Sequence, residues 1–95
     1  MKQQVTARDR NECQAARHSM VIGFECRGQH TVHELVRRAQ WRDGIYVVEN
    51  CVLICAAHHD WVHAHPEAAH DVGLLMRLHE RPVEWERIAD EVLGR

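Results

Sequence analysis

Aromatic side chains are scarce in this chain. Of its 95 residues, three are Trp and only one each is Phe or Tyr, so large hydrophobic anchors are few. A domain of this length buries only about two-thirds of the surface that its unfolded chain exposes, which leaves a thin core. Small domains with thin cores often gain stability from a bound metal. We therefore expect a single domain, residues 1–95, that depends on more than apolar packing.

Long apolar runs, repeats and linkers are also missing. No stretch approaches the roughly 20 apolar residues of a membrane-spanning helix, and the first ten residues, MKQQVTARDR, do not resemble a signal peptide. We expect a cytoplasmic protein with no membrane partner. In that reducing compartment, four cysteines indicate metal binding rather than disulfides. The absence of internal repeats, low-complexity tracts and Pro/Gly-rich linkers predicts no domain boundary.

The charge is nearly balanced overall but unevenly distributed. A net charge of −2 and a pI of about 6.5 argue against a dedicated nucleic-acid binder. Residues 1–42, however, contain eight Lys or Arg against four Asp or Glu, whereas residues 43–95 contain four against ten. A basic first half can face phosphate while the acidic half faces water or a partner. Charge therefore permits nucleic-acid binding without predicting it.

The pattern of the middle of the chain predicts a long-looped hairpin followed by a helix. TVHELV (31–36) is rich in β-branched and apolar residues, and YVVENCVLIC (46–55) is a second extended run, interrupted at Glu49-Asn50. Between them lies a loop with Asp43-Gly44, the strongest turn signal in the chain. AAHHDWVHAH (56–65) has the composition of a helix.

Further helical segments are expected on both sides of this core. Residues 5–18 are compatible with a short helix or a loop around Cys13. Pro66 ends the preceding helix or opens the next, and a short helical turn follows up to Gly73. Pro82 suits the first position of a last helix, for which we expect a partial apolar stripe made of Val83, Ile88, Val92 and Leu93.

Histidines are concentrated in CAAHHDWVHAHPEAAH (55–70), which contains one Cys and five His. Positions four apart share one face of a helix, so His59 and His63 can hold one ion together. Such a site needs a third protein ligand from another element, and His33 on the preceding strand is the natural candidate. An isolated pair of this kind is more simply explained as solvated surface histidines, but nearby cysteines favour a metal.

A second set of ligands follows from the cysteines. Cys55 and His58 have the two-residue gap with which a zinc knuckle delivers two ligands to one ion. Cys13 and Cys26 would complete a Cys3His site, although free cysteines are often merely buried thiols. That simpler interpretation fits Cys51 better, and we leave it out of the site.

Taken in order, VHELVRR, VENCVLICAAHHDWVHAHP and GLL resemble the HNH endonucleases, especially small forms from bacteria and their phages. The resemblance covers roughly residues 10–76 and leaves the helical tail, residues 77–95, unexplained. It implies the ββα-metal fold, a small α+β architecture in which a hairpin and a helix surround one catalytic ion, here with a structural zinc knuckle. It also implies a location in a bacterium or a phage-infected host cell.

The implied activity is metal-dependent hydrolysis of DNA phosphodiester bonds, by nicking or by double-strand cutting. The His, Asn and His residues after which the family is named correspond by resemblance to His33 (with Glu34), Asn50 and His63. His33, His59 and His63 would hold one catalytic ion (Mg²⁺, Mn²⁺, Ni²⁺ or Zn²⁺), separate from the structural Zn²⁺. Asn50 would form hydrogen bonds with the backbone on the other side of the loop and so support the site.

The chain departs from the family pattern at three places. Many members have His-His or Asp-His where this chain has His33-Glu34, so Glu34 takes the general-base position; alternatively, Glu34 is a metal ligand and His33 the base. A glutamate with an ordinary pKa of about 4.3 is a weak base unless burial raises that value. His58 stands where the knuckle often has a fourth cysteine. The long Cys13–Cys26 separation leaves open that His18 or His30 replaces one of them.

Arg37 and Arg38 follow the first strand and are candidates for holding DNA phosphate oxygens, or else form a solvated loop. DNA is the expected partner, and by resemblance alone a phage terminase or another packaging protein is a second one. The alternative function is a catalytically weak, zinc-stabilised DNA-binding or protein-interaction module of the same fold. A purely structural zinc protein would leave His33, His59 and His63 unexplained.

Overall fold

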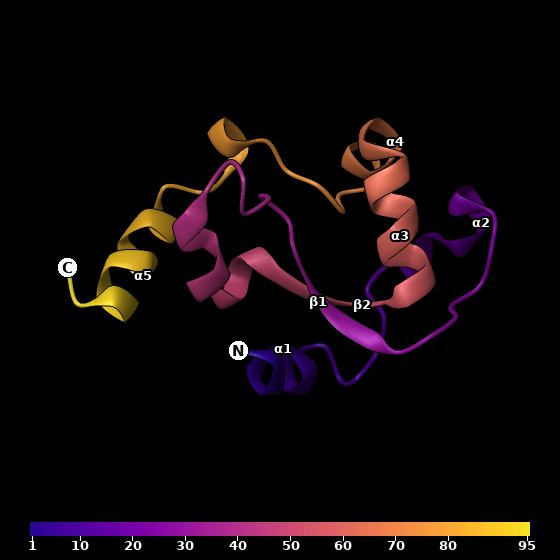
Figure 1. The fold of residues 1–95 in the computed structure, drawn as a ribbon, viewed down its shortest axis with the longest axis horizontal. Helices are drawn as coiled ribbons and strands as arrows, with labels where there is room; N and C mark the ends of the chain where they lie inside the picture. Colours follow the sequence, from indigo (N-terminus) through magenta and orange to yellow (C-terminus); the bar gives the residue numbers. More distant parts are fainter.

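Two antiparallel strands lie at the centre of the molecule, and helices surround them (Figure 1). In this computed structural model, all 95 residues are described. The helices and strands, in chain order, are α1 (Lys2–Arg8), α2 (Ser19–Ile22), β1 (His30–Glu34), β2 (Cys51–Cys55), α3 (Ala56–Ala64), α4 (Pro66–Asp71) and α5 (Glu84–Leu93). The chain therefore has the small α+β fold that was predicted. None of its helices combines the length and apolar character needed to cross a membrane.

The two faces of the sheet are covered by different helices. β1 and β2 pair so that His33 lies opposite Val52, and successive side chains point to opposite faces. On one face Leu53 packs with Val5 of α1, and on the other Ile54 packs with Val62 of α3. Figure 1 shows α1 and α3 on opposite sides of the strands. This arrangement turns His33 towards α3.

The second strand is shorter than predicted. Residues 46–55 were expected to be extended with an interruption at Glu49-Asn50. Only Cys51–Cys55, after that interruption, pair with β1, and Arg42–Tyr46 and Val48–Asn50 form 3₁₀ turns. The cause is Asn50, which is fully buried and bonds to backbone on both sides of the loop. Gly44 permits this close approach, because a Cβ there would lie 2.6 Å from Asn50 Nδ2.

The amino-terminal segment is anchored to β2. The Arg8 guanidinium donates to the carbonyl of Val48, 2.8 Å away, and also to that of Cys51. The Asp9 carboxylate accepts a 2.8 Å hydrogen bond from the amide of Leu53. The helix α1 thus begins before the predicted range 5–18, and Cys13 follows in a loop that these contacts hold against the sheet.

The last helix packs through a different face from the one predicted. Trp85 stacks on Trp41 with ring centroids 6.3 Å apart, and Ala89 is buried beside it. The predicted stripe is wrong, since Val83 is 84% exposed and Val92 57% exposed, and only Ile88 of its members packs against this cluster. The helix α5 therefore covers the loop between the strands.

Candidate metal centres

The four residues predicted for the structural site converge in space. One ligand atom from each of Cys13, Cys26, Cys55 and His58 lies within 4.8 Å of all the others. The three sulfurs lie 3.7, 3.6 and 3.1 Å from His58 Nδ1, in that order. Two ligands of a tetrahedral zinc ion, each 2.0 to 2.3 Å from it, are about 3.5 Å apart. These residues are therefore positioned to hold a metal ion.

The junction of β2 and α3 supplies two of these ligands. Cys55 ends β2 and caps α3, where its sulfur accepts a 3.4 Å hydrogen bond from the amide of His58. The amide of Cys55 in turn donates to the sulfur of Cys13 at 3.2 Å. Amide donors of this kind favour thiolate over thiol. A local turn and a distant loop thus meet at one point.

The segment that carries Cys26 approaches closely because it contains glycine. Gly28 has a positive φ of 84°, and a Cβ there would lie 2.7 Å from that of Ala56. Backbone bonds fix this approach: the amide of Ala57 donates to the carbonyl of Arg27 at 3.0 Å. The exposed Cys26 is thereby placed against the start of α3.

A backbone carbonyl orients the His58 ring. Its Nε2 lies 3.0 Å from the carbonyl oxygen of Phe24, which can only accept, so Nε2 carries the proton and Nδ1 faces the sulfurs. The Phe24 ring stacks on the imidazole with centroids 4.6 Å apart. Such an outer partner fixes the tautomer of a metal-binding histidine.

The thiols of this cluster influence one another's ionisation. The pKa of Cys26 is raised to about 12 by burial and by the neighbouring Cys13 and Cys55. For Cys55, burial also acts to raise the pKa, but backbone hydrogen bonds outweigh it and lower the value. Several thiolates this close together need a cation to balance their charge, and Cys3His is a set that zinc accepts.

The other candidates for this site lie elsewhere. Neither His18 nor His30 belongs to the cluster, and His30 Nδ1 instead lies 3.3 Å from the side-chain oxygen of Asn11. Cys51 is buried on β2, and its sulfur contacts the carbonyl of Val47 at 3.4 Å. Cys51 is therefore a buried thiol outside the site.

A second cluster forms between β1 and α3. His33, His59 and His63 each place a ring nitrogen within 4.8 Å of the others, and the Nε2 atoms of His59 and His63 are 3.1 Å apart. His33 is only 2% exposed, and its Nε2 donates to the carbonyl of Leu74 at 2.5 Å. That bond leaves Nδ1 of His33 as the acceptor, the form in which imidazole binds metals.

The environment lowers the pKa of two of these imidazoles, those of His33 and His59. The pKa of His33 is lowered to about 4, chiefly by burial and further by the charges of His59, His63 and Arg37. Burial and the neighbouring His63 also lower the pKa of His59. Because metals bind the unprotonated ring, these two residues are ready to bind at neutral pH.

Glu34 lies at the edge of this cluster rather than in it. Its carboxylate is not among the converging ligand atoms, because consecutive strand residues point to opposite faces. It nevertheless lines the same hollow, of about 380 Å³, as His33, His59 and His63. Its side chain pairs with that of Arg38, 3.3 Å away, which is 69% exposed.

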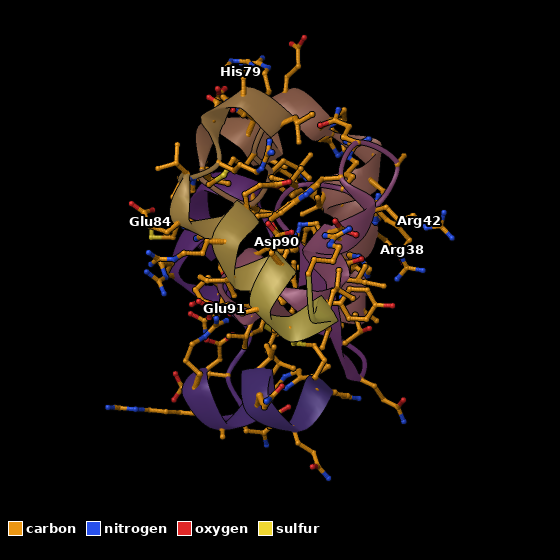
Figure 2. All side chains as sticks on the ribbon, turned by 90° about the vertical axis from the view of Figure 1, so that its left-hand side faces the viewer. Arg38, Arg42, His79, Glu84, Asp90 and Glu91 are labelled. Atoms are coloured by element: carbon orange, nitrogen blue, oxygen red, sulfur yellow. The ribbon has the colours of Figure 1, made fainter.

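The predicted arginines and asparagine differ in their surroundings. Arg37 and Arg38 both line the hollow beside the histidines, and Figure 2 shows Arg38 and Arg42 extending from the same side of the molecule. Asn50 makes no contact with the cluster. Its Oδ1 accepts from the amide of Val36 at 2.8 Å, and its Nδ2 donates to the carbonyls of Val36 and Gly44, each at 3.2 Å.

Sequence reasoning missed the segment after α4. Leu74 holds His33, and the amide of Met76 donates to the carbonyl of Leu35 at 2.8 Å, so this segment runs beside the end of β1. Gly73, with a φ of 82°, starts the turn that brings it there. A backbone carbonyl has no sequence signature, and this glycine was the one available signal.

Comparison with known proteins adds no identification. No protein-family model, no curated protein and no solved structure matches this chain.

Proposed function

We propose that this protein is a metal-dependent endonuclease that hydrolyses DNA phosphodiester bonds, with the ββα-metal architecture of the HNH family. The observation that carries the proposal is the convergence of His33, His59 and His63 on one side of an open hollow. Three imidazoles from a strand and a helix suit a divalent ion that keeps positions open for substrate. A purely structural ion would need a fourth protein ligand.

The residues present fit such an ion. His33 is oriented by Leu74, and His59 and His63 are four residues apart on one helix face. A divalent ion bound there would supply Lewis acidity towards a phosphate oxygen and an attacking water. The protein's own part is to hold those three nitrogens and to admit a phosphodiester into the hollow.

Glu34 is the proposed general base. Its carboxylate lines the hollow but does not join the ligand set, which favours a role beside the ion over one on it. It would accept a proton from the attacking water, a contribution of about 10²–10⁴-fold in rate. The carboxylate is paired with Arg38, and this ion pair must break before Glu34 can accept the proton.

Arg37 and Arg38 would bind phosphate oxygens at the mouth of the hollow. Figure 2 shows Arg38 and Arg42 on the opposite side of this view from Glu84 of α5. Arg38 and Arg42 can therefore approach DNA while the carboxylate of Glu84 lies on the other side of the molecule. Asn50 supports the loop that carries both arginines.

A zinc-stabilised binding module is the second candidate, favoured by the ion pair between Glu34 and Arg38, which occupies the proposed general base. Such a module needs only the Cys3His ion, whereas a nuclease needs the histidine site as well.

The test is incubation of the purified protein with supercoiled plasmid. After weakly bound metal has been removed by brief chelation, Mg²⁺, Mn²⁺, Ni²⁺ or Zn²⁺ is added back separately. The proposal predicts nicked or linear DNA with 5′-phosphate ends, in the presence of at least one ion. If a folded protein that retains its Cys3His zinc leaves the plasmid intact with every ion, the module is the better description.

A further inference from the structure

A second hollow lies directly beside the histidine site. It measures about 170 Å³ and is lined by polar side chains from three segments: Arg37 and Gln40 after β1, Glu67 and His70 on α4, and Arg77 after α4. Arg37 also lines the hollow of the histidine cluster. The two hollows are therefore neighbours that share one lining residue, Arg37.

The backbone fixes the two arginines at this hollow. The hydrogen bond from His33 to Leu74 and the one from Met76 to Leu35 tie together two segments that run in the same direction. Arg37 lies two residues beyond Leu35 and Arg77 one residue beyond Met76, so both emerge at the same end of this pairing. One backbone hydrogen bond and one bond from the His33 side chain thus fix where the two arginines emerge.

Neither guanidinium makes a hydrogen bond or ion pair within the protein, although the charge of Arg77 acts on the nearby Glu80 carboxylate. Of the hydrogen bonds and ion pairs made by side chains, none involves the guanidinium of Arg37 or Arg77. By contrast, His70 is paired with Glu80 at 2.8 Å, and Glu80 also accepts from the amide of Arg77 at 2.7 Å. The carboxylate of Glu80 is thus occupied, and Glu67 is the only carboxylate that lines the hollow.

We propose that this second hollow binds a phosphodiester of the same DNA strand, next to the one held at the histidine site. Unpaired guanidinium groups bind phosphate oxygens through two parallel hydrogen bonds, and Arg37 can contact both groups because it lines both hollows. The inference rests on the proposed function. It states that the protein contacts at least two consecutive phosphates of the DNA strand. Arg77 thereby acquires a role in binding, and Glu67 becomes an unfavourable charge beside it.

Arg77 and Glu67 carry opposite charges, so neutralising each of them should change DNA binding in opposite directions. In a His63→Ala background, which prevents cleavage, binding of a fluorescent DNA duplex is measured by anisotropy across a range of salt concentrations. Arg77→Gln should weaken binding several-fold and reduce the slope of log affinity against log salt by about one. Glu67→Gln should strengthen binding, because it removes repulsion from the same phosphate. Arg87→Gln and Glu84→Gln, at exposed positions of α5, serve as controls and should match the background protein.

The outcomes separate this inference from the proposed function. If Arg77→Gln and Glu67→Gln both bind DNA like the controls while the wild type cuts plasmid, the second phosphate site is wrong and the nuclease stands. If the wild type never cuts but the two variants shift binding in opposite directions, the site stands without the nuclease. Inorganic phosphate, added at constant ionic strength, distinguishes the source of the anion. Displacement of DNA by low millimolar phosphate, lost in Arg77→Gln, would indicate a pocket for free phosphate and overturn the proposal.

Discussion

The Nε2 atom of His33 lies 2.5 Å from the carbonyl oxygen of Leu74, so a buried imidazole is oriented by backbone more than forty positions away. His58 repeats the arrangement with the carbonyl of Phe24 at 3.0 Å. At His58 this contact turns Nδ1 towards the three sulfurs, and at His33 it leaves Nδ1 as the nitrogen able to bind a metal. Both sites are therefore prepared by the fold in the way that outer partners prepare metal ligands.

The Cys3His ion should be required for folding. Its ligands tie the amino-terminal loop to the junction of β2 and α3, and the core is too thin to hold them alone. We expect Cys55→Ala or Cys26→Ala to give unfolded or aggregated protein without zinc, as measured by circular dichroism and metal analysis. Cys51→Ala is the matched control, because Cys51 is buried outside the cluster, and it should keep one structural zinc per chain. A folded Cys55→Ala protein with that zinc still bound would disprove the ligand set.

Removing the side chain of Asn50 should destabilise the loop between the strands. The change Asn50→Ala leaves the amide and the carbonyl of Val36 without their partner and removes one of the hydrogen bonds to the carbonyl of Gly44, which still accepts from Val47. A buried polar group left unpaired costs about 1–3 kcal/mol, so the free energy of unfolding should fall by about 3 kcal/mol in urea denaturation. The structural zinc should remain bound, since Asn50 makes no contact with its ligands. A change below about 0.5 kcal/mol would mean that water replaces the amide.

Acidification should destabilise the fold through His33. The pKa of its imidazole is lowered to about 4, chiefly by burial, whereas an imidazole in an unfolded chain titrates near 6.5. Between these values the unfolded chain binds a proton that the native chain does not. This contribution to stability is therefore fully present above pH 6.5 and is lost as the pH falls towards 4.

The variant His33→Gln measures this effect, with urea denaturation of both proteins at pH 7 and pH 5 in the absence of added metal. The wild type should lose more stability than the variant over this interval. Equal losses in the two proteins would show that His33 is protonated as readily in the native state as in the unfolded one.

Substitutions at Glu34 and at His33 should reduce DNA cleavage in different ways. Glu34→Gln keeps the shape of the side chain but cannot accept a proton, so cleavage should fall by about 10²–10⁴-fold while binding of ion and DNA persists. His33→Ala should weaken binding of the ion itself, and raised metal concentrations should restore part of its activity. The opposite pattern, with Glu34→Gln rescued by metal and His33→Ala not, would exchange the two roles. Wild-type cleavage by both Glu34→Gln and Glu34→Ala would remove Glu34 from the mechanism.

Local patterns made most of the site predictable from sequence. Cys55 and His58 are three residues apart across a turn, and His59 and His63 are four apart on a helix, so spacing alone places each pair. Cys13 was predicted as a ligand because no other role was evident, and the structure brings it to the cluster.

Long-range packing explains what was not predicted. The apolar pattern of α5 pointed to Val92, but Trp85 determines which face is buried, because its partner Trp41 lies 44 positions away. The interruption at Glu49-Asn50 was predicted, but the residues before it form 3₁₀ turns instead of a strand, because the hydrogen bonds of Asn50 hold the loop. The contact between His33 and Leu74 uses a backbone carbonyl, which every residue possesses.

The central claim is that His33, His59 and His63 form a catalytic metal site separate from the structural one, and the most direct measurement compares His63→Ala with His79→Ala. His79 is an exposed histidine outside both clusters, at one end of the molecule (Figure 2). Both variants should keep the structural zinc and the thermal transition of the wild type. Plasmid conversion is then measured with the ion that best supports the wild-type protein. The account predicts cleavage by His79→Ala at the wild-type rate and none by His63→Ala. Normal cleavage by a folded His63→Ala protein would contradict it.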